Sequence, residues 1–221
     1  KQKTAYEIGV RLVGSEMCIR DRVDTPPINN IATQSRLYGL LRTSDVFIFV
    51  SDLTNNPVQQ TRQSFQELEE WGFKLVSDDS NLIDRQTHKP TVIVCNKADI
   101  PDALDQFDSM EQEFSSKFPV IMTSAEESVG LDELGEHIFD ALKIIRVYTK
   151  SPREKLQGFN KKEPVVLPIG STVGEAAQQV HKDLSRSLKY GVLWGKSGKF
   201  DGQRVGRNHV MSDGDIIEIH I

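Results

Sequence analysis

Two continuous apolar segments, VFIFV at 46–50 and TVIVCN at 91–96, constrain the fold more than any other feature of this chain. Both are rich in β-branched residues and lack the alternation of apolar and polar positions that a half-exposed strand shows. Runs of this kind are typical of strands covered on both faces, as in a parallel sheet. The two segments therefore predict an α/β fold.

The residues between these strands have the spacing of an amphipathic helix. Either Asn55 or Asn56 is a suitable N-cap, and Pro57 fits the first helical turn. The apolar positions that we expect on the buried side of this helix lie three and four residues apart, as a helical stripe requires: Phe65, Leu68, Trp71 and Leu75.

The same alternation continues along the chain. A second helix is expected after Pro101, a third strand at 119–125 and a third helix at 129–145. Strands that alternate with helices of this length predict right-handed βαβ units and a parallel sheet with helices on both faces. Because ligands bind such sheets beyond the carboxyl ends of the strands, the residues after each strand are the first candidates for a site.

Polar segments follow the second and third strands at these positions. The segment NKAD at 96–99 resembles the NKxD motif of GTP-binding proteins, and SA at 124–125 resembles the motif that follows it in those proteins. A polar turn after a strand is the alternative interpretation of either segment alone. The two segments together, in this order and at successive strand ends, favour guanine recognition.

The resemblance implies a role for each residue of the two segments. The carboxylate of Asp99 accepts from the ring N–H and the exocyclic amine of guanine, a pair of donors that adenine does not offer. Asn96 ties the loops together, and the aliphatic stem of Lys97 lies over the base. Ser124 and Ala125 complete the site, where a backbone N–H recognises the guanine oxygen.

The segment VDTPPI at 23–28 resembles the DxxG motif, which implies that Asp24 holds Mg²⁺ through water. Pro27 stands where that motif has glycine, and proline has no N–H to donate to a γ-phosphate. Ile28 occupies the place where many GTPases have a catalytic glutamine. A chain with this segment is expected to orient an attacking water by other means.

No GxxxxGK(S/T) segment, the loop that holds the β- and γ-phosphates in such proteins, occurs in the sequence. Residues 1–22, KQKTAYEIGVRLVGSEMCIRDR, back-translate to DNA that resembles two short-read sequencing adapters flanking a sample index. We therefore interpret 1–22 as translated adapter and the rest as a fragment of a longer GTPase. The fragment is expected to have no GTPase activity and to be poorly soluble.

Composition narrows the class of protein. The net charge of −5 argues against wholesale nucleic-acid binding, and no apolar run is long enough to cross a bilayer. Cys95 is the one cysteine outside the adapter-like segment, so no disulfide framework is expected and a cytoplasmic location is favoured. Seven basic residues and one acid lie between Lys143 and Lys162. This stretch is either a solvated linker or a contact for RNA phosphates.

The last part of the chain has a different pattern. Residues 165–168 read as a strand, Thr172 as the N-cap of a helix over 173–188, and short strands follow at 190–194 and 216–221. A helix packed across a small sheet is a ubiquitin-like β-grasp. Its Pro168, Gly170 and closing VGRNHVMSDGDIIEI resemble the TGS domain, and with the G-domain motifs the chain resembles the DRG/Obg group, DRG being the developmentally regulated GTP-binding proteins.

The resemblance implies a GTP-binding switch with GTP/GDP and Mg²⁺ as cofactors and with ribosome or RNA contacts through the TGS domain. We expect a partial G domain at 23–146, a basic linker at 147–162 and the TGS domain at 163–221. Near Trp194, one interpretation is an RNA-binding face that is made by Lys196, Lys199, Arg204 and Arg207. A core tryptophan beside solvated lysines is the alternative there, and a non-catalytic RNA- or protein-binding module is the alternative for the whole chain. His181 and His209 are expected to be packing or capping residues.

Overall fold

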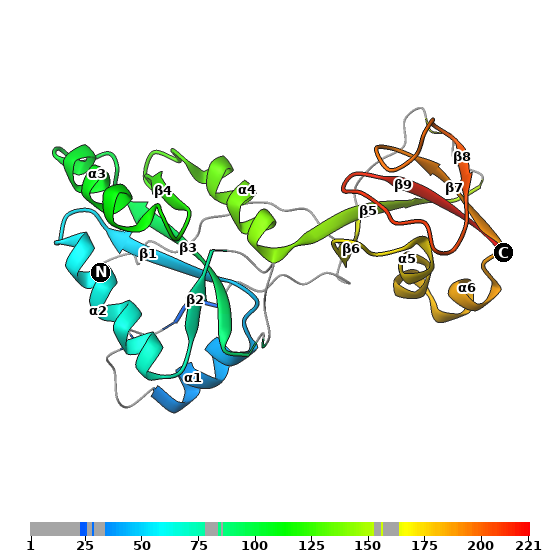
Figure 1. The fold of residues 1–221 in the computed structure, drawn as a ribbon. Helices are drawn as coiled ribbons and strands as arrows, with labels where there is room; N and C mark the ends of the chain where they lie inside the picture. The colour runs from blue at the N-terminus through cyan, green and yellow to red at the C-terminus, as the bar shows by residue number, and fades with distance from the viewer. Residues whose placement is uncertain are drawn as a thin grey trace, which may run out of the picture. The chain divides into compact units, whose positions relative to one another are not determined.

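A computed structural model describes residues 23–25, 28, 34–77, 84, 86–152, 156 and 164–221. These residues form two compact units, Val23–Leu142 and Lys143–Ile221, which are treated separately below. The adapter-like segment 1–22 and Pro27 lie outside the described residues. Figure 1 shows the helices and strands of both units.

The N-terminal unit contains a parallel sheet, which confirms the predicted α/β class. Strand β3 is central and pairs in parallel with β1, β2 and β4. Asp52 aligns with Asn96, and Asn96 with Thr123, so the carboxyl ends of three strands meet at one edge of the sheet. The elements are α1 (Gln34–Thr43), β1 (Phe47–Asp52), α2 (Pro57–Glu70), β2 (Lys74–Val76), β3 (His88–Asn96), α3 (Ala103–Phe114), β4 (Val120–Thr123) and α4 (Leu131–Leu142).

Both faces of this sheet are covered, as the continuous apolar strands predicted. Successive side chains of a strand point to opposite faces, and β3 divides accordingly. Ile93 and Cys95 pack with residues of α2 and α3, whereas Val92 and Val94 pack with residues of α4. Burial raises the pKa of the Cys95 thiol to about 12.

Helix α2 is shorter than the predicted helix. It ends at Glu70, and Gly72 turns the chain at φ +88°, a region that favours glycine. Leu75 therefore lies on the short strand β2, which the helical spacing concealed. At the other end, Asn56 is the N-cap and Pro57 the first residue, but the Asn56 side chain bonds to Gln59 instead of capping the helix.

Helix α1, which the sequence did not predict, is fixed by a buried lysine. The Nζ atom of Lys89 donates to the carbonyl oxygens of Arg42 (2.9 Å) and Ser44 (2.6 Å) at the C-terminal end of the helix. Cations are favourable at this end because unpaired carbonyls gather there. Burial lowers the pKa of Lys89, and the nearby charges of Asp45 and Asp84 oppose this effect in part.

The C-terminal unit is a five-stranded sheet with helices packed on it, as a β-grasp requires. The strand order is β6-β5-β9-β7-β8, with β5 and β9 parallel and the other pairs antiparallel. Its core includes Val147, Val173, Leu193 and Ile217. The elements are β5 (Ile144–Lys150), β6 (Pro164–Pro168), α5 (Val173–Val180), α6 (Lys182–Ser187), β7 (Tyr190–Trp194), β8 (Gln203–Val205) and β9 (Ile216–His220).

Two expectations for this unit were wrong in detail. Residues 144–150 are strand β5 at the centre of the sheet, where the sequence predicted the end of a helix and the start of a linker. Lys143, at φ 50°, ends the preceding helix, and Ile145 and Val147 then alternate into the core. The basic residues of this stretch concealed that alternation.

The predicted helix over 173–188 is two helices. Thr172 caps α5 as expected, in a capping box with Glu175. His181 is extended (φ −164°, ψ 135°), and its Nδ1 accepts from the amide of Asp183, which makes it the N-cap of α6. The break brings Ser185 back onto α5, where its Oγ donates to the carbonyl of Gly174 at 3.2 Å.

Candidate functional site

The carboxyl edge of the N-terminal sheet brings the predicted guanine motifs together. Strands β3 and β4 lie side by side, so the loops that follow them begin at neighbouring positions. The amide of Ala98 donates to the carbonyl of Thr123 (3.0 Å), and the amide of Leu53 donates to the carbonyl of Asn96 (3.2 Å). The loop at 96–99 is therefore attached to both of its neighbours by backbone bonds.

Asn96 links the two motif loops through its side chain. Its Oδ1 accepts from the amide of Ala125 at 3.1 Å and from the Thr123 hydroxyl at 3.4 Å. Ala125 belongs to the segment in which, by the resemblance, a backbone N–H recognises the guanine oxygen. A base that uses the Ala125 amide must share it with Asn96 or displace Asn96 from it.

Ser124 orients the carboxylate of Asp99. The Ser124 Oγ donates to Asp99 Oδ1 at 2.5 Å and accepts from the Glu127 amide at 3.1 Å. Ser124 is buried, whereas Asp99 is exposed. The loop is closed by Gly130, where a Cβ would collide with the Met122 carbonyl oxygen. Asp99 thus presents an acceptor from a fixed position.

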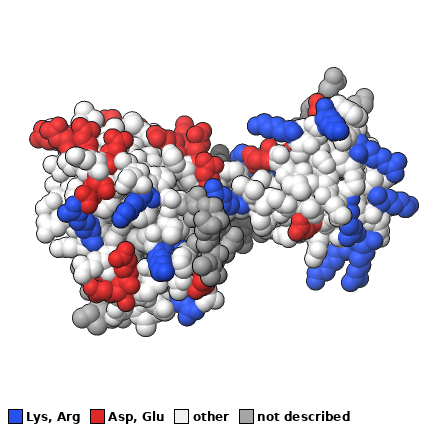
Figure 2. Space-filling model, in the orientation of Figure 1, with Lys and Arg blue, Asp and Glu red and all other residues white. Residues whose placement is uncertain are grey.

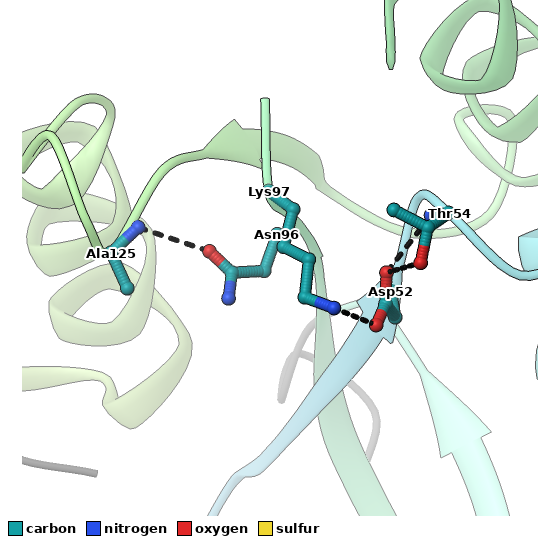
Figure 3. Close-up of polar contacts among 5 residues, drawn as sticks. All are labelled: Asp52, Thr54, Asn96, Lys97 and Ala125. Atoms are coloured by element: carbon teal, nitrogen blue, oxygen red, sulfur yellow. Dashed lines mark hydrogen bonds and ion pairs between the residues drawn. The ribbon is translucent and has the colours of Figure 1, made fainter. Parts of the chain in front are cut away.

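Lys97 points away from these contacts and toward β1. Its Nζ pairs with Asp52 Oδ2 at 2.5 Å, while Asp52 Oδ1 accepts from the amide and hydroxyl of Thr54 at 2.9 and 2.6 Å. Figure 3 shows Asn96 and Lys97 directed to opposite sides, one toward Ala125 and the other toward Asp52. Burial raises the pKa of Asp52, but its hydrogen bonds with Lys97 and Thr54 outweigh burial and lower it below the usual value.

The sequence analysis did not identify Asp52 as part of the site. The sequence did contain a signal for it, because Asp52 is the acidic residue at the carboxyl end of the first buried strand. Its partner was not evident, since the pairing of Asp52 with Lys97 depends on the neighbouring placement of β1 and β3.

A pocket of about 460 Å³ lies at the same edge of the sheet. Its walls come from the loops that follow β1 and β3, and two of its residues, Asn56 and Asp102, have positive φ. None of the predicted base-reading residues lines it, so the pocket and the motif residues are distinct features. The lining residues are Leu53, Thr54, Asn56, Ile100, Pro101, Asp102, Ala103 and Gln106.

The predicted magnesium residue stands apart from other ligands. Asp24 is exposed, and no group of three or more His, Cys, Asp or Glu side chains suited to a metal occurs among the residues that the structure describes. Mg²⁺ in nucleotide sites is held by one or two carboxylates together with phosphates and water. Asp24 fits one such water-mediated contact but does not form a metal site alone. Ile28 packs against the cluster of Phe47, Leu68 and Phe73.

The basic residues predicted to contact RNA are all exposed, but two of them also have structural partners. The Arg204 guanidinium lies 3.6 Å from the centre of the Tyr190 ring, and Arg207 bonds to the carbonyl of Ser185. Lys150 lies 5.2 Å from the Trp194 ring. His209 contacts the Ser197 hydroxyl at 3.1 Å through Nε2.

No helix within the described part of the chain is long and apolar enough to cross a membrane. Comparison with protein families matches residues 145–221 to the TGS domain. This match begins in β5, well before the predicted start at residue 163.

Several relatives are named as GTP-binding proteins. An uncharacterized GTP-binding protein of Methanocaldococcus jannaschii is 37% identical over 134 residues, which cover 60% of this chain and 33% of the relative. Developmentally-regulated GTP-binding protein 1 of Xenopus laevis is 36% identical over 132 residues, covering 59% and 34%. A developmentally-regulated GTP-binding protein 2 homolog of Dictyostelium discoideum is 27% identical and covers 89% and 68%.

Among solved structures, a GTP binding protein from Pyrococcus horikoshii OT3 superposes with a TM-score of 0.61 at 19% identity. The match covers 81% of this chain and 79% of the other, and it supports the fold. The chain spans about a third of the length of the first two relatives above. It is thus similar to developmentally-regulated GTP-binding proteins, and its residues 145–221 match the TGS domain.

Proposed function

We propose that the N-terminal unit binds guanine nucleotides at the loops that follow β3 and β4. The observation that carries this proposal is the pair of contacts between the two loops, Asn96 to the Ala125 amide and Ser124 to Asp99. A polar turn without a ligand has no need to fix an exposed carboxylate beside an adjacent loop. The relatives that are named GTP-binding proteins support the same conclusion.

The chemistry of the base accounts for the residues. Guanine offers two adjacent donors, its ring N–H and exocyclic amine, and Asp99 is an exposed carboxylate that accepts two hydrogen bonds. A site built to pair with such donors rejects a base that lacks them, because such a base removes water from the carboxylate without donating hydrogen bonds to it. In this proposal Asn96, Ser124 and Ala125 hold the geometry, and Lys97 covers the base.

In the same proposal, Mg²⁺ accompanies the phosphates of GTP or GDP, and Asp24 contacts it through water. GTP is the ligand of the switched-on state of the whole protein, which acts in the cytoplasm.

The test changes the base that residue 99 is expected to select, from guanine to xanthine. Asp99→Asn replaces one acceptor by an N–H donor, which suits the C2 carbonyl of xanthine in place of the guanine amine. We expect the wild type to prefer guanosine diphosphate and the variant to prefer xanthosine diphosphate, measured by titration of ¹⁵N-labelled protein with each. Asp108→Asn, an exposed helix position on the same unit, is the matched control. Equal affinity of the wild type for both diphosphates contradicts the proposal.

A second function, RNA binding by the C-terminal unit, is favoured by the different environments of its acidic and basic side chains. Four acids are engaged internally: Asp213 with Arg146, Asp215 with Ser197, Glu218 with Lys150 and Glu175 in the capping box. Seven other basic side chains are instead exposed, and Figure 2 shows more Lys and Arg than Asp and Glu on the visible face of this unit. The seven are Lys182, Arg186, Lys189, Lys196, Lys199, Arg204 and Arg207.

A surface of this kind suits phosphate contacts, as in a ribosomal or other RNA partner. We expect K196A/K199A to weaken binding to a structured RNA and to reduce the salt dependence of binding, since each lost phosphate contact lowers the salt slope by about one unit. E69A/E70A, which removes exposed acids from α2 in the other unit, is the control. RNA binding that is insensitive to salt argues against this function.

A further inference from the structure

An acidic side chain at the end of β1 is joined to the candidate guanine site. Asp52 lies opposite Asn96 in the β1–β3 register, and Asn96 directly precedes Lys97. One carboxylate oxygen of Asp52 pairs with the Lys97 ammonium, and the other accepts two hydrogen bonds from Thr54 (Figure 3). Thr54 therefore fixes the carboxylate, and the carboxylate in turn fixes the lysine.

This ion pair is unsuited to a purely stabilising role. The side chains of Lys97 and Asp52 remain 49% and 39% exposed, and pairs so open to solvent add little to stability. The pair nevertheless holds a long side chain that has much rotamer freedom to lose. Its larger effect is on where the lysine stem lies.

The backbone supports the same direction. Lys97 has φ 75°, in the left-handed region that a non-glycine residue seldom adopts. Such conformations persist where the surroundings impose them, and they cluster at binding sites. Here Asn96 is anchored on the β4 side by the Ala125 amide, and Lys97 on the β1 side by Asp52. The side chains of Asn96 and Lys97 are thus held in opposite directions by contacts with the two neighbouring segments.

We propose that Asp52 is a positioning residue for guanine recognition, one that holds the Lys97 ammonium so that the lysine stem lies across the base. This inference rests on the proposed guanine site and adds a residue to it. Asp52 does not touch the nucleotide. It acts by fixing Lys97 before the ligand arrives, and Thr54 supports it.

The experiment measures guanosine and guanosine diphosphate affinities by NMR titration of the whole chain with four variants. Asp52→Asn keeps an acceptor for Thr54 but loses the charged partner of Lys97. Lys97→Met keeps the stem and loses the ammonium, whereas Lys97→Ala loses both. The fourth variant combines Asp52→Asn with Lys97→Met, and Asp108→Asn is the control for removal of an exposed carboxylate.

Fixing one flexible side chain is worth a few-fold in affinity, so we expect Asp52→Asn and Lys97→Met each to weaken binding by roughly twofold to tenfold. The double variant is expected to match either single one, and Lys97→Ala to be weaker still. Guanosine and its diphosphate lose affinity by the same factor, because the contact is to the base. Inorganic pyrophosphate, used as a third probe, is unaffected.

Each outcome is decisive. If Asp52→Asn binds guanosine diphosphate as the wild type does, or if the two losses add in the double variant, the positioning role is wrong while the guanine site stands. If the wild type binds neither guanine ligand, both proposals are overturned. If Asp52→Asn lowers the melting temperature, the affinity of Lys97→Met is used in its place. Lys97→Met also breaks the ion pair, but it leaves Asp52 and Thr54 unchanged.

Discussion

The side-chain oxygen of Asn96 accepts a 3.1 Å hydrogen bond from the backbone amide of Ala125. This contact joins the loop after β3 to the loop after β4, and it uses a residue that directly precedes Lys97. A hydrogen bond between neutral groups contributes only about 0.5–1.5 kcal/mol. The hydrogen bond matters more for positioning than for stability, because it sets the distance between the two loops that carry Asp99 and Ser124.

Asn96→Ala is expected to separate the two loops without unfolding the unit. The Ala125 amide then loses its acceptor, and its hydrogen exchange quickens by about tenfold, the factor that corresponds to roughly 1.4 kcal/mol. Guanosine diphosphate affinity falls in the same variant, because Asp99 and the Ala125 amide no longer keep a fixed separation. Exchange of the Val94 amide, within the sheet, is the internal control. Tighter binding in Asn96→Ala would mean that Asn96 competes with the base for this amide.

The boundary between the two units is testable by expressing the C-terminal unit alone. Residues 143–221 include β5, which lies between β6 and β9 in the sheet, so we expect this piece to unfold in one cooperative transition. Residues 163–221 lack β5, which leaves β6 without its partner and exposes an edge of β9. Circular dichroism during thermal unfolding distinguishes the two pieces, and a cooperative transition in the shorter one contradicts the prediction.

The ion pair between Arg146 and Asp213 predicts an acid-sensitive contact in the same unit. The guanidinium donates to both carboxylate oxygens, from Nε at 3.1 Å and from Nη2 at 2.7 Å. The hydrogen bond from Arg146 holds the pKa of Asp213 below its usual value. A lowered carboxyl pKa stabilises the folded state above the unfolded pKa of about 3.9, and this contribution is lost as the pH falls through the folded pKa.

We therefore expect Asp213→Asn to unfold at a lower temperature than the wild type between pH 5 and 7, by an amount that does not change over that range. Below about pH 4 the difference shrinks, because protonation of Asp213 removes the same charge in the wild type. Differential scanning calorimetry across this series provides the measurement. A difference that persists undiminished at the lowest pH shows that packing and not charge accounts for it.

The ion pair between Lys150 and Glu218 is expected to behave differently, because it is buried. The two side chains are only 5% and 11% exposed, and His220 also contacts Glu218 at 2.7 Å. Removing one partner leaves an uncompensated charge, so Lys150→Met or Glu218→Leu costs roughly 3–5 kcal/mol in the free energy of unfolding. The double variant K150M/E218L is expected to cost much less than the sum. Urea unfolding measures the free energy of unfolding of all three variants. If the cost of the double variant equals the sum of the two single costs, the uncompensated charge does not explain them.

Several features of the fold were predictable because they are local. The continuous apolar strands at 47–52 and 91–96, the Thr172 capping box and the strand at 190–194 depend on residue types within a few positions of each other. Strand β2 and strand β5 were missed for a related reason. Three residues are too few for a periodicity, and the basic residues around β5 resembled a linker until their pairing with β6 and β9 was known.

The sequence by itself determined which chemical groups stand at the carboxyl ends of the strands, since the motif residues are named by their order along the chain. Only the tertiary structure decided their partners: Asp52 for Lys97, Ala125 for Asn96, and Ser124 for Asp99. Each of these contacts joins residues at least 25 positions apart, and each depends on the register in which β1, β3 and β4 pair. Register is set by packing on both faces of the sheet, which no local pattern of residues specifies.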